Sequence, residues 1–286
     1  MEEAQSSVGF DFVRSLAAEL SRGNVDLPSF PEIAVRVRRV LSDPKSSVEQ
    51  VVRVVGSEPA LAARLLRIAN SASLNRSGRA VTDLRTAINR IGYNMVRSAA
   101  ISFSMAQIRA SNKLSGLEHH LNELWQRSTL VAAFSYVLAR MCTKVNPDEA
   151  MLTGMMHGIG KLYVLTRAID HPELFISDKT LNDIIGEWHA TIGKAILENW
   201  DFSEAMAQAV GDQADFSRAD DGPPDLSDVI AVAILMAAHG EDASGLEAAL
   251  TGLAAAKRLR LDEEKTQAVI RESTAEVTAL SQALGS

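Results

Sequence analysis

The stretch Asn146–Leu165 constrains the fold most strongly, because it predicts one helix with a buried face. Asn146 can accept a hydrogen bond from a free amide of the first turn, and Pro147 suits that turn. Apolar residues then recur three or four positions apart, so one side belongs in a core. These residues are Leu152, Met155, Ile159 and Leu162. A neighbouring stripe of small residues around one imidazole lets a helix or a ligand approach the backbone closely. It holds Gly154, His157, Gly158 and Lys161.

The composition favours an all-α, multi-helical fold. The chain has 286 residues, of which 47% are hydrophobic and 5% aromatic, enough for one large domain or two coupled lobes. Ala, Leu and Val are plentiful, which favours helices over β-sandwiches. Helical spacing of apolar residues also predicts helices over residues 121–141, 181–199 and 228–239, and two more helices in the tail over 245–286.

The single cysteine and the N-terminus indicate a reducing compartment. Cys142 alone excludes a disulfide framework and an all-cysteine zinc site. The first ten residues lack the basic and apolar blocks of a signal peptide. No apolar run approaches the roughly 20 residues that span a bilayer. We therefore expect a cytoplasmic protein with no membrane partner.

Charge is distributed unevenly, although the whole chain carries −7. Residues 28–97 hold 12 Lys and Arg against 5 Asp and Glu, whereas residues 98–286 hold 15 against 26. A basic lobe attracts acidic or phosphate-bearing partners, and arginine binds phosphate through two parallel hydrogen bonds. The arginines that could form this partner- or phosphate-binding face are Arg64, Arg67, Arg76, Arg79 and Arg85.

Three other interpretations of the basic lobe stay open: a solvated face, a dock for the chain's own acidic half, and a nucleic-acid surface. Nucleic-acid-binding modules are usually basic overall. Because the pI of this chain is about 5.4, we do not expect a nucleic acid to be the partner.

Several blocks resemble the bacterial HDOD domain in their order and spacing: LPSFPEIAVRV from Leu27, SEPALAARLLRIANSAS from Ser57 and VTDLRTAINRIG from Val81. The resemblance covers roughly residues 27–215. It implies an N-terminal helical lobe over 27–110, packed on a lobe over 111–215 that is similar to the HD superfamily of metal-dependent phosphohydrolases. Residues 1–26 then form an N-terminal helix and linker, and residues 216–286 a C-terminal helical extension.

The resemblance implies that the metal site of the HD enzymes is degenerate here. Their central helix carries an adjacent His-Asp pair followed by Ile-Gly-Lys, but Gly158 stands where the aspartate would follow His157. Arg127 takes the position of the first ligand, His189 that of the third, and Ala238 that of the last aspartate. A guanidinium is permanently charged and repels a metal ion. We therefore expect no metal, no cofactor and no catalysis.

Less specific interpretations of the same residues also stand. His157 and His189 can be buried polar residues that are hydrogen-bonded to helix ends or neighbouring side chains. Gly154 and Gly158 can serve close helix packing. The sequence contains no phosphate-binding motif of the G-x-x-x-x-G-K-[ST] type.

The HDOD resemblance implies a bacterial signal-transduction or regulatory protein that works by binding. The expected partners are other signalling or regulatory proteins, with an acidic or phosphate-bearing small ligand as a second candidate. Two alternatives are a metal-dependent HD-type phosphohydrolase acting on nucleotides or cyclic dinucleotides, and a nucleic-acid-binding regulator that uses the arginine-rich lobe. The sequence does not indicate an oligomeric state.

Overall fold

The computed structural model describes residues 12–19, 32–43, 45–70, 80–109, 116–171, 174, 178–200, 202–218, 222–240 and 242–284. All regular structure in these ranges is helical, which confirms the predicted all-α fold. Residues 12–19 form the first helix. The others are α2 (Glu32–Ser42), α3 (Val48–Gly56), α4 (Pro59–Ala69), α5 (Leu84–Arg109), α6 (Glu118–Cys142), α7 (Pro147–Met156), α8 (Ile159–Ala168), α9 (Asp178–Asn199), α10 (Glu204–Gly211), α11 (Leu226–His239), α12 (Ala243–Leu250), α13 (Ala254–Arg258) and α14 (Glu263–Leu284).

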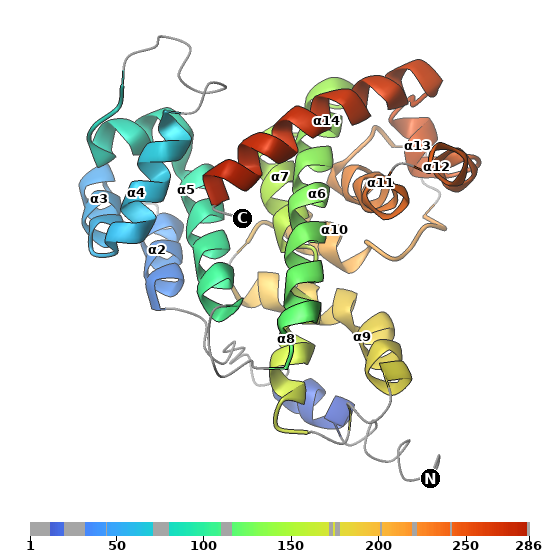
Figure 1. The fold of residues 1–286 in the computed structure, drawn as a ribbon, viewed down its shortest axis with the longest axis horizontal. Coiled ribbons are helices and arrows are strands. Elements are labelled where there is room, and N and C mark those ends of the chain that lie inside the picture. The colour runs from blue at the N-terminus through green and yellow to red at the C-terminus, as the bar shows by residue number, and fades with distance from the viewer. Residues whose placement is uncertain are drawn as a thin grey trace.

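The helices α2–α5 form the N-terminal lobe around a core of their own (Figure 1). Ser47 caps α3 through a reciprocal capping box with Gln50, which satisfies two backbone amides at the start of the helix. At Gly92 the backbone of α5 has a φ of +76°, a left-handed value that glycine adopts without strain. The helix therefore turns at Gly92.

Asn70 ties the end of α4 to the chain that leads into α5. Its side-chain oxygen accepts a hydrogen bond from the amide of Val81 at 2.7 Å, and its amide group donates to the Val81 carbonyl at 2.8 Å. The same amide group donates to the carbonyl of Leu66 in the last turn of α4. One side chain thus satisfies backbone groups of Leu66 and Val81, which lie fifteen residues apart.

The second core is larger and is built around α6, which lies between α7, α11 and α14. Phe12 and Leu16 of the first helix belong to this core, although they precede the N-terminal lobe in the sequence. Leu246, Leu253 and Val269 of the C-terminal segment belong to it as well. The segment after residue 216 therefore packs as part of the second lobe.

The predicted continuous helix over Asn146–Leu165 is wrong in one respect: it is interrupted. α7 ends at Met156 and α8 begins at Ile159. At the break, the side chain of Gln213 donates to the carbonyl of His157 at 3.0 Å, and the imidazole Nδ1 of His157 lies 2.7 Å from the carbonyl of Gly154. These side chains form hydrogen bonds with carbonyl groups that would accept from backbone amides in a continuous helix.

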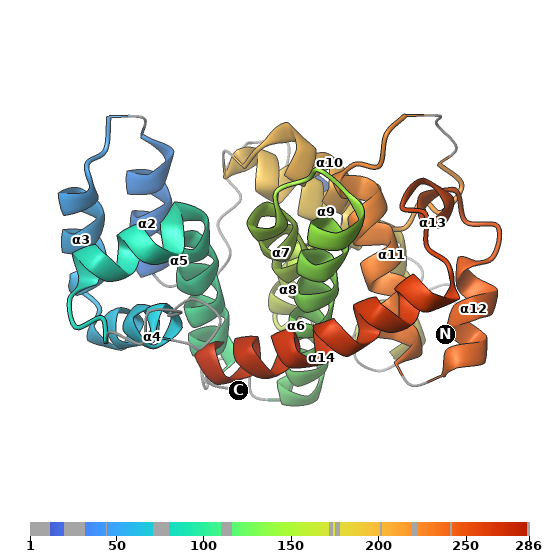
Figure 2. The ribbon, with the colours of Figure 1, turned by 90° about the horizontal axis from the view of Figure 1, so that it is seen from above.

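The tail contains three helices, α12, α13 and α14, where two were predicted. The spacing of apolar residues does not predict α13, because this helix has only five residues. α14 runs along α6 and reaches α4 and α5 of the N-terminal lobe, as Figure 2 shows. None of the described helices is long and apolar enough to cross a membrane.

Two arginines of the N-terminal lobe stack on aromatic rings of the second lobe. Arg38 of α2 lies 5.7 Å from the ring of Trp200, and Arg97 of α5 lies 5.3 Å from the ring of Phe202. A guanidinium over an aromatic face is attracted by the ring quadrupole. Part of the basic charge of the N-terminal lobe thus holds the two lobes together.

Candidate functional site

A cavity of about 400 Å³ opens between α6, α8, α9 and α11. Arg127 of α6 and Lys161 of α8 line it, together with Asn182 of α9 and Ala237 of α11. The remaining lining residues are His120, Glu123, Leu124, Gln126, Leu130, Leu165 and Ile185. Four helices far apart in the sequence therefore converge where the resemblance places the degenerate metal site.

The two histidines of the predicted site are held by neighbouring carbonyls. The Nδ1 of His157 lies 2.7 Å from the carbonyl of Gly154, and the Nδ1 of His189 lies 2.7 Å from the carbonyl of Ile185. Because a carbonyl only accepts, Nδ1 carries the proton in each neutral ring, and Nε2 is left as an acceptor. Nε2 of His157 is buried and has no hydrogen-bond partner among the described residues.

Burial and nearby cations keep His157 neutral. Burial, with smaller contributions from the charges of Lys161 and Arg127, lowers its pKa to about 3, against the raising effect of the hydrogen bond to Gly154. Burial and the charge of Lys161 likewise lower the pKa of His189. Charges shift a pKa strongly only over short distances. Lys161 therefore lies near both histidines, and Arg127 lies near His157.

Leu124 fills the space beside Gly158, where an HD enzyme carries its aspartate. A Cβ atom built on Gly158 would lie 2.4 Å from Cδ1 of Leu124. A Cβ on Gly154 would lie 2.8 Å from the backbone of Ala132 in α6. Both glycines thus allow close helix packing. An aspartate at position 158 would require Leu124 to move.

Arg127 and Lys161 leave positive charge in the cavity. No hydrogen bond or ion pair joins either side chain to the rest of the described chain. Burial lowers the pKa of Lys161, and the charge of Arg127 lowers it further. In the sequence, Lys161 stands out only as part of the small-residue stripe around His157. Its position four residues after His157 put it on the same helical face, and that was the available signal.

The predicted register on α11 is displaced by one residue. Ala237 lines the cavity, whereas Ala238 is exposed to solvent. The carboxylate nearest to this position in α11 is Asp228, nine residues before Ala237, and so about 13 Å away along the helix axis. The residue of α11 that lines the cavity is therefore Ala237, the neighbour of the predicted Ala238.

The residues present do not fit a metal centre of the HD type. Over the ranges that the structure describes, no group of three or more His, Cys, Asp or Glu side chains is arranged to hold a metal ion. Two imidazoles remain, and the charges beside them are the cations Arg127 and Lys161. Positive neighbours oppose a divalent cation, which prefers carboxylate and neutral imidazole ligands.

One member of the predicted arginine face, Arg64, is buried. Arg64 is only 5% exposed and lies 5.8 Å from the ring of Phe103, so its place on an exposed face was predicted wrongly. Burial, with a smaller contribution from the charge of Arg67, lowers the pKa of Arg64 to about 10. The helix register explains the error: Arg64 falls between Leu61 and Leu65, on the buried side of α4.

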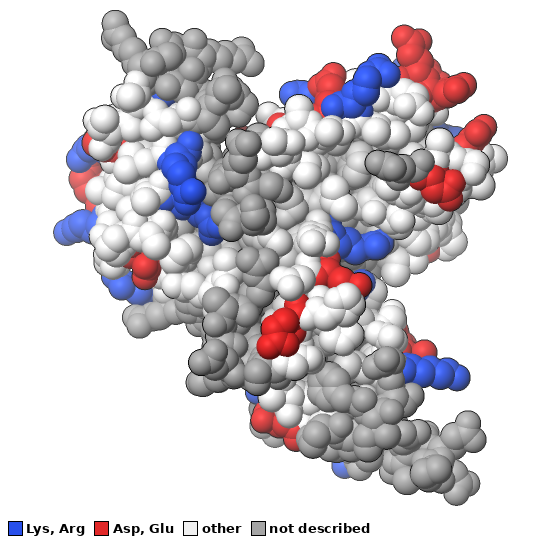
Figure 3. Space-filling view, in the orientation of Figure 1, with Lys and Arg blue, Asp and Glu red and all other residues white. Residues whose placement is uncertain are grey.

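The other arginines predicted for this face lie in different environments. Arg67 is exposed, and Arg85 forms an ion pair with Glu49 of the same lobe. Arg76 and Arg79 lie outside the described residues. On the face drawn in Figure 3, blue Lys and Arg side chains lie over the N-terminal lobe at the left, and the larger red groups lie over the other helices.

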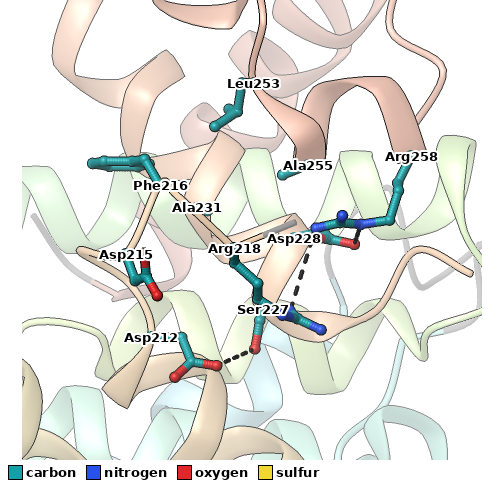
Figure 4. A pocket seen from close by; sticks show the side chains of 10 residues that line it. All are labelled: Asp212, Asp215, Phe216, Arg218, Ser227, Asp228, Ala231, Leu253, Ala255 and Arg258. Atoms are coloured by element: carbon teal, nitrogen blue, oxygen red, sulfur yellow. Dashed lines mark hydrogen bonds and ion pairs between the residues drawn. The ribbon is translucent and has the colours of Figure 1, made fainter. Parts of the chain in front are cut away.

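A second cavity lies between α10, α11 and α13 and is shown in Figure 4. The buried Asp228 accepts a hydrogen bond from Nε of Arg258 at 2.9 Å, and Arg218 lies 3.8 Å from the same carboxylate. The cavity has a volume of about 10 Å³, which is room for about one water molecule. We interpret this ion-pair network as the attachment of α13 to α11.

With this geometry in view, comparison with known proteins identifies the family. Residues 27–216 match the HDOD domain, which is about two thirds of the chain. The chain belongs to the HDOD domain family. The match confirms the resemblance carried by the blocks from Leu27, Ser57 and Val81.

Several solved structures have folds similar to that of this chain. A proposed metal-dependent phosphohydrolase from Shewanella amazonensis SB2B is 29% identical, with a TM-score of 0.76, over 96% of this chain and 99% of that one. An HDOD domain protein from Geobacter sulfurreducens is 20% identical, with a TM-score of 0.53, over 94% of this chain and 92% of that one. A proposed signal transduction protein from Marinobacter aquaeolei VT8 is 20% identical, with a TM-score of 0.61, over 98% of this chain and 66% of that one.

A curated relative is longer than this chain. An uncharacterized protein of Treponema pallidum (strain Nichols) is 23% identical over 215 residues. The matched region covers 68% of this chain and 39% of that protein. This HDOD chain thus spans about two fifths of the relative's length.

Proposed function

We propose that this HDOD protein is a regulatory module that works by binding and has no metal-dependent hydrolase activity. The observation that carries the proposal is the content of the cavity between α6, α8, α9 and α11. Leu124 occupies the space beside Gly158, where HD enzymes carry an aspartate, and Arg127 and Lys161 place cations beside the two histidines. Hydrolysis by these enzymes needs a bound cation that activates water, and this cavity favours anions.

One observation favours the alternative, a metal-dependent phosphohydrolase. His157 and His189 each bond a carbonyl through Nδ1 and keep Nε2 as an acceptor. Second-shell carbonyls orient metal-binding histidines in the same way. Two imidazoles alone fall short of the three protein ligands typical of a catalytic zinc site. The alternative therefore requires ligands from outside the described residues.

Elemental analysis and an activity assay decide between the two functions. The protein is purified without chelators or a metal-affinity tag, and iron, manganese and zinc are measured per chain. Nucleotides and cyclic dinucleotides are then tested as substrates with each metal added. We expect metal contents far below one per chain, and no turnover.

A near-stoichiometric metal that disappears in the His157→Ala and His189→Ala variants, together with turnover, would overturn the proposal. The matched control is His119→Ala, since His119 is exposed on α6 and pairs with Glu123.

We expect the partners to be other signalling or regulatory proteins. They are sought by affinity purification from the source bacterium under several growth conditions. Each recovered protein is then purified and titrated against the HDOD protein by calorimetry. Failure of every recovered protein to bind in the purified system would count against a protein partner.

A further inference from the structure

We propose that the cavity between α6, α8, α9 and α11 binds a small organic molecule through a phosphate group held by Arg127 and Lys161. The proposal deepens the proposed function and rests on it, because it assumes that no metal ion occupies the site. It assigns a ligand class to a regulatory protein that has the scaffold of a hydrolase.

Two cations line the cavity without a paired counter-ion among the described residues. Arg127 extends from α6 and Lys161 from α8, and both line the cavity. Neither has an ion pair or hydrogen bond within the described part of the chain. Burying like charges together costs free energy unless an opposite charge is present. An anion in the cavity would remove this cost.

The cavity has little negative charge of its own that would compete with an anionic ligand for the two cations. Glu123 is the one acidic residue among those that line the cavity. Its side chain is 62% exposed and lies 3.4 Å from Nε2 of His119, on the outer part of α6. The lining residues from α9 and α11 are Asn182, Ile185 and Ala237, which are all uncharged. The interior of the cavity is therefore positive.

The combined charge of Arg127 and Lys161 determines which anionic group suits the cavity. A phosphate monoester carries about −1.5 to −2 at pH 7, which matches two cations better than a single carboxylate does. The planar guanidinium of Arg127 can give two parallel hydrogen bonds to phosphate oxygens, and the ammonium of Lys161 acts as a point charge. The site therefore favours a phosphate over a carboxylate.

The volume and lining of the cavity indicate what kind of molecule carries the phosphate group. The cavity volume of about 400 Å³ lies in the range of small-molecule sites and far exceeds the volume of a bare phosphate ion. Leu124, Leu130 and Leu165 supply apolar walls, and the amides of Gln126 and Asn182 supply hydrogen bonds. This lining suits a molecule with a ring or chain attached to its phosphate.

Phenyl phosphate is a suitable probe because it combines a phosphate dianion with one apolar ring. Its binding is measured by isothermal titration calorimetry at pH 7.5, in EDTA and at constant ionic strength. Inorganic phosphate and phenol are titrated in parallel. We expect phenyl phosphate to bind with a stoichiometry of one, inorganic phosphate to bind more weakly, and phenol not to bind.

The variants Arg127→Gln and Lys161→Gln test the two cations. Each should weaken phenyl phosphate binding by about tenfold or more, since each removes a charge-assisted hydrogen bond. The control Arg53→Gln removes an equal charge from an exposed position on α3 and should leave the affinity unchanged. If a variant fails to fold, the contact between the ligand and Lys161 is tested in the wild-type protein instead. Phenyl phosphate should then protect Lys161 from amine acetylation, as mapped by mass spectrometry.

The outcomes separate this proposal from the proposed function. Absence of binding in EDTA and in added metal, or equal loss of affinity in Arg53→Gln, would overturn the phosphate site alone. Unchanged acetylation of Lys161 at saturating phenyl phosphate would do the same. Binding that requires a metal and is lost in His157→Ala and His189→Ala would overturn both proposals.

Discussion

Substitution of Gly160 by alanine tests how closely α8 and α9 pack behind the cavity. A Cβ atom at position 160 would lie 1.9 Å from the carbonyl oxygen of His189 and 2.8 Å from the amide nitrogen of Gly193. Both atoms belong to the backbone of α9, so no side-chain rotation relieves the overlap. The two helices would have to separate by about 1.5 Å to reach an ordinary contact distance.

The expected cost follows from this geometry. Overpacking a core typically costs about 1–3 kcal/mol when side chains can adjust. Because the obstacle here is helix backbone, we expect the Gly160→Ala variant to lose about 3 kcal/mol or more of its free energy of unfolding. For a chain of this size, such a loss corresponds to a fall in Tm of roughly 6–12 °C.

The assay is urea unfolding at 25 °C followed by far-ultraviolet circular dichroism. The matched control is Gly186→Ala, also in α9, where no atom lies within 4 Å of the added Cβ. Alanine there should raise the free energy of unfolding by about 0.5–1 kcal/mol, because it is the better helix former. A Gly160→Ala variant within about 1 kcal/mol of the wild type would refute the inferred close contact of α8 and α9.

Two further predictions concern buried charge. Burial holds the pKa of His157 near 3, against its ordinary value of 6.5, so the unfolded chain binds a proton that the folded chain excludes. The free energy of unfolding should therefore fall by up to about 1.4 kcal/mol per pH unit as the pH drops below 6.5. The His157→Gln variant, measured by urea titration at pH 5, 6 and 7, should lack this component; equal slopes would contradict the assignment. Arg258→Met should cost about 3–5 kcal/mol because it leaves Asp228 buried without its main partner, and Asp228→Asn in the same chain should recover part of that loss in a double-mutant cycle.

Local features of the sequence predicted the helices well. The apolar spacing before Met141 and after Leu181 is a property of consecutive residues, and the structure confirms it in α6 and α9. The all-α fold likewise agrees with a composition rich in good helix formers such as Ala and Leu. These predictions succeeded because backbone preference and periodicity act over a few residues.

Features that depend on distant partners were not predictable in this way. The break between α7 and α8 involves Gln213, which lies 56 residues after His157 and donates to its carbonyl. The burial of Arg64 depends on the ring of Phe103 in α5. On α11, a rotation of one residue decides whether Ala237 or Ala238 faces the cavity, and periodicity does not fix a helix orientation that closely.

The candidate site was therefore only partly determined by the sequence. The resemblance to the HD enzymes pointed to Arg127, His157, Gly158 and His189, and the identity of Gly158 alone removes one carboxylate ligand. Only the tertiary structure showed that Leu124 fills the vacated space and that Lys161 joins Arg127 in the cavity. The physical reason is that composition and spacing fix which residues are present and how each helix forms, whereas shape and charge in a cavity depend on how four separate helices pack.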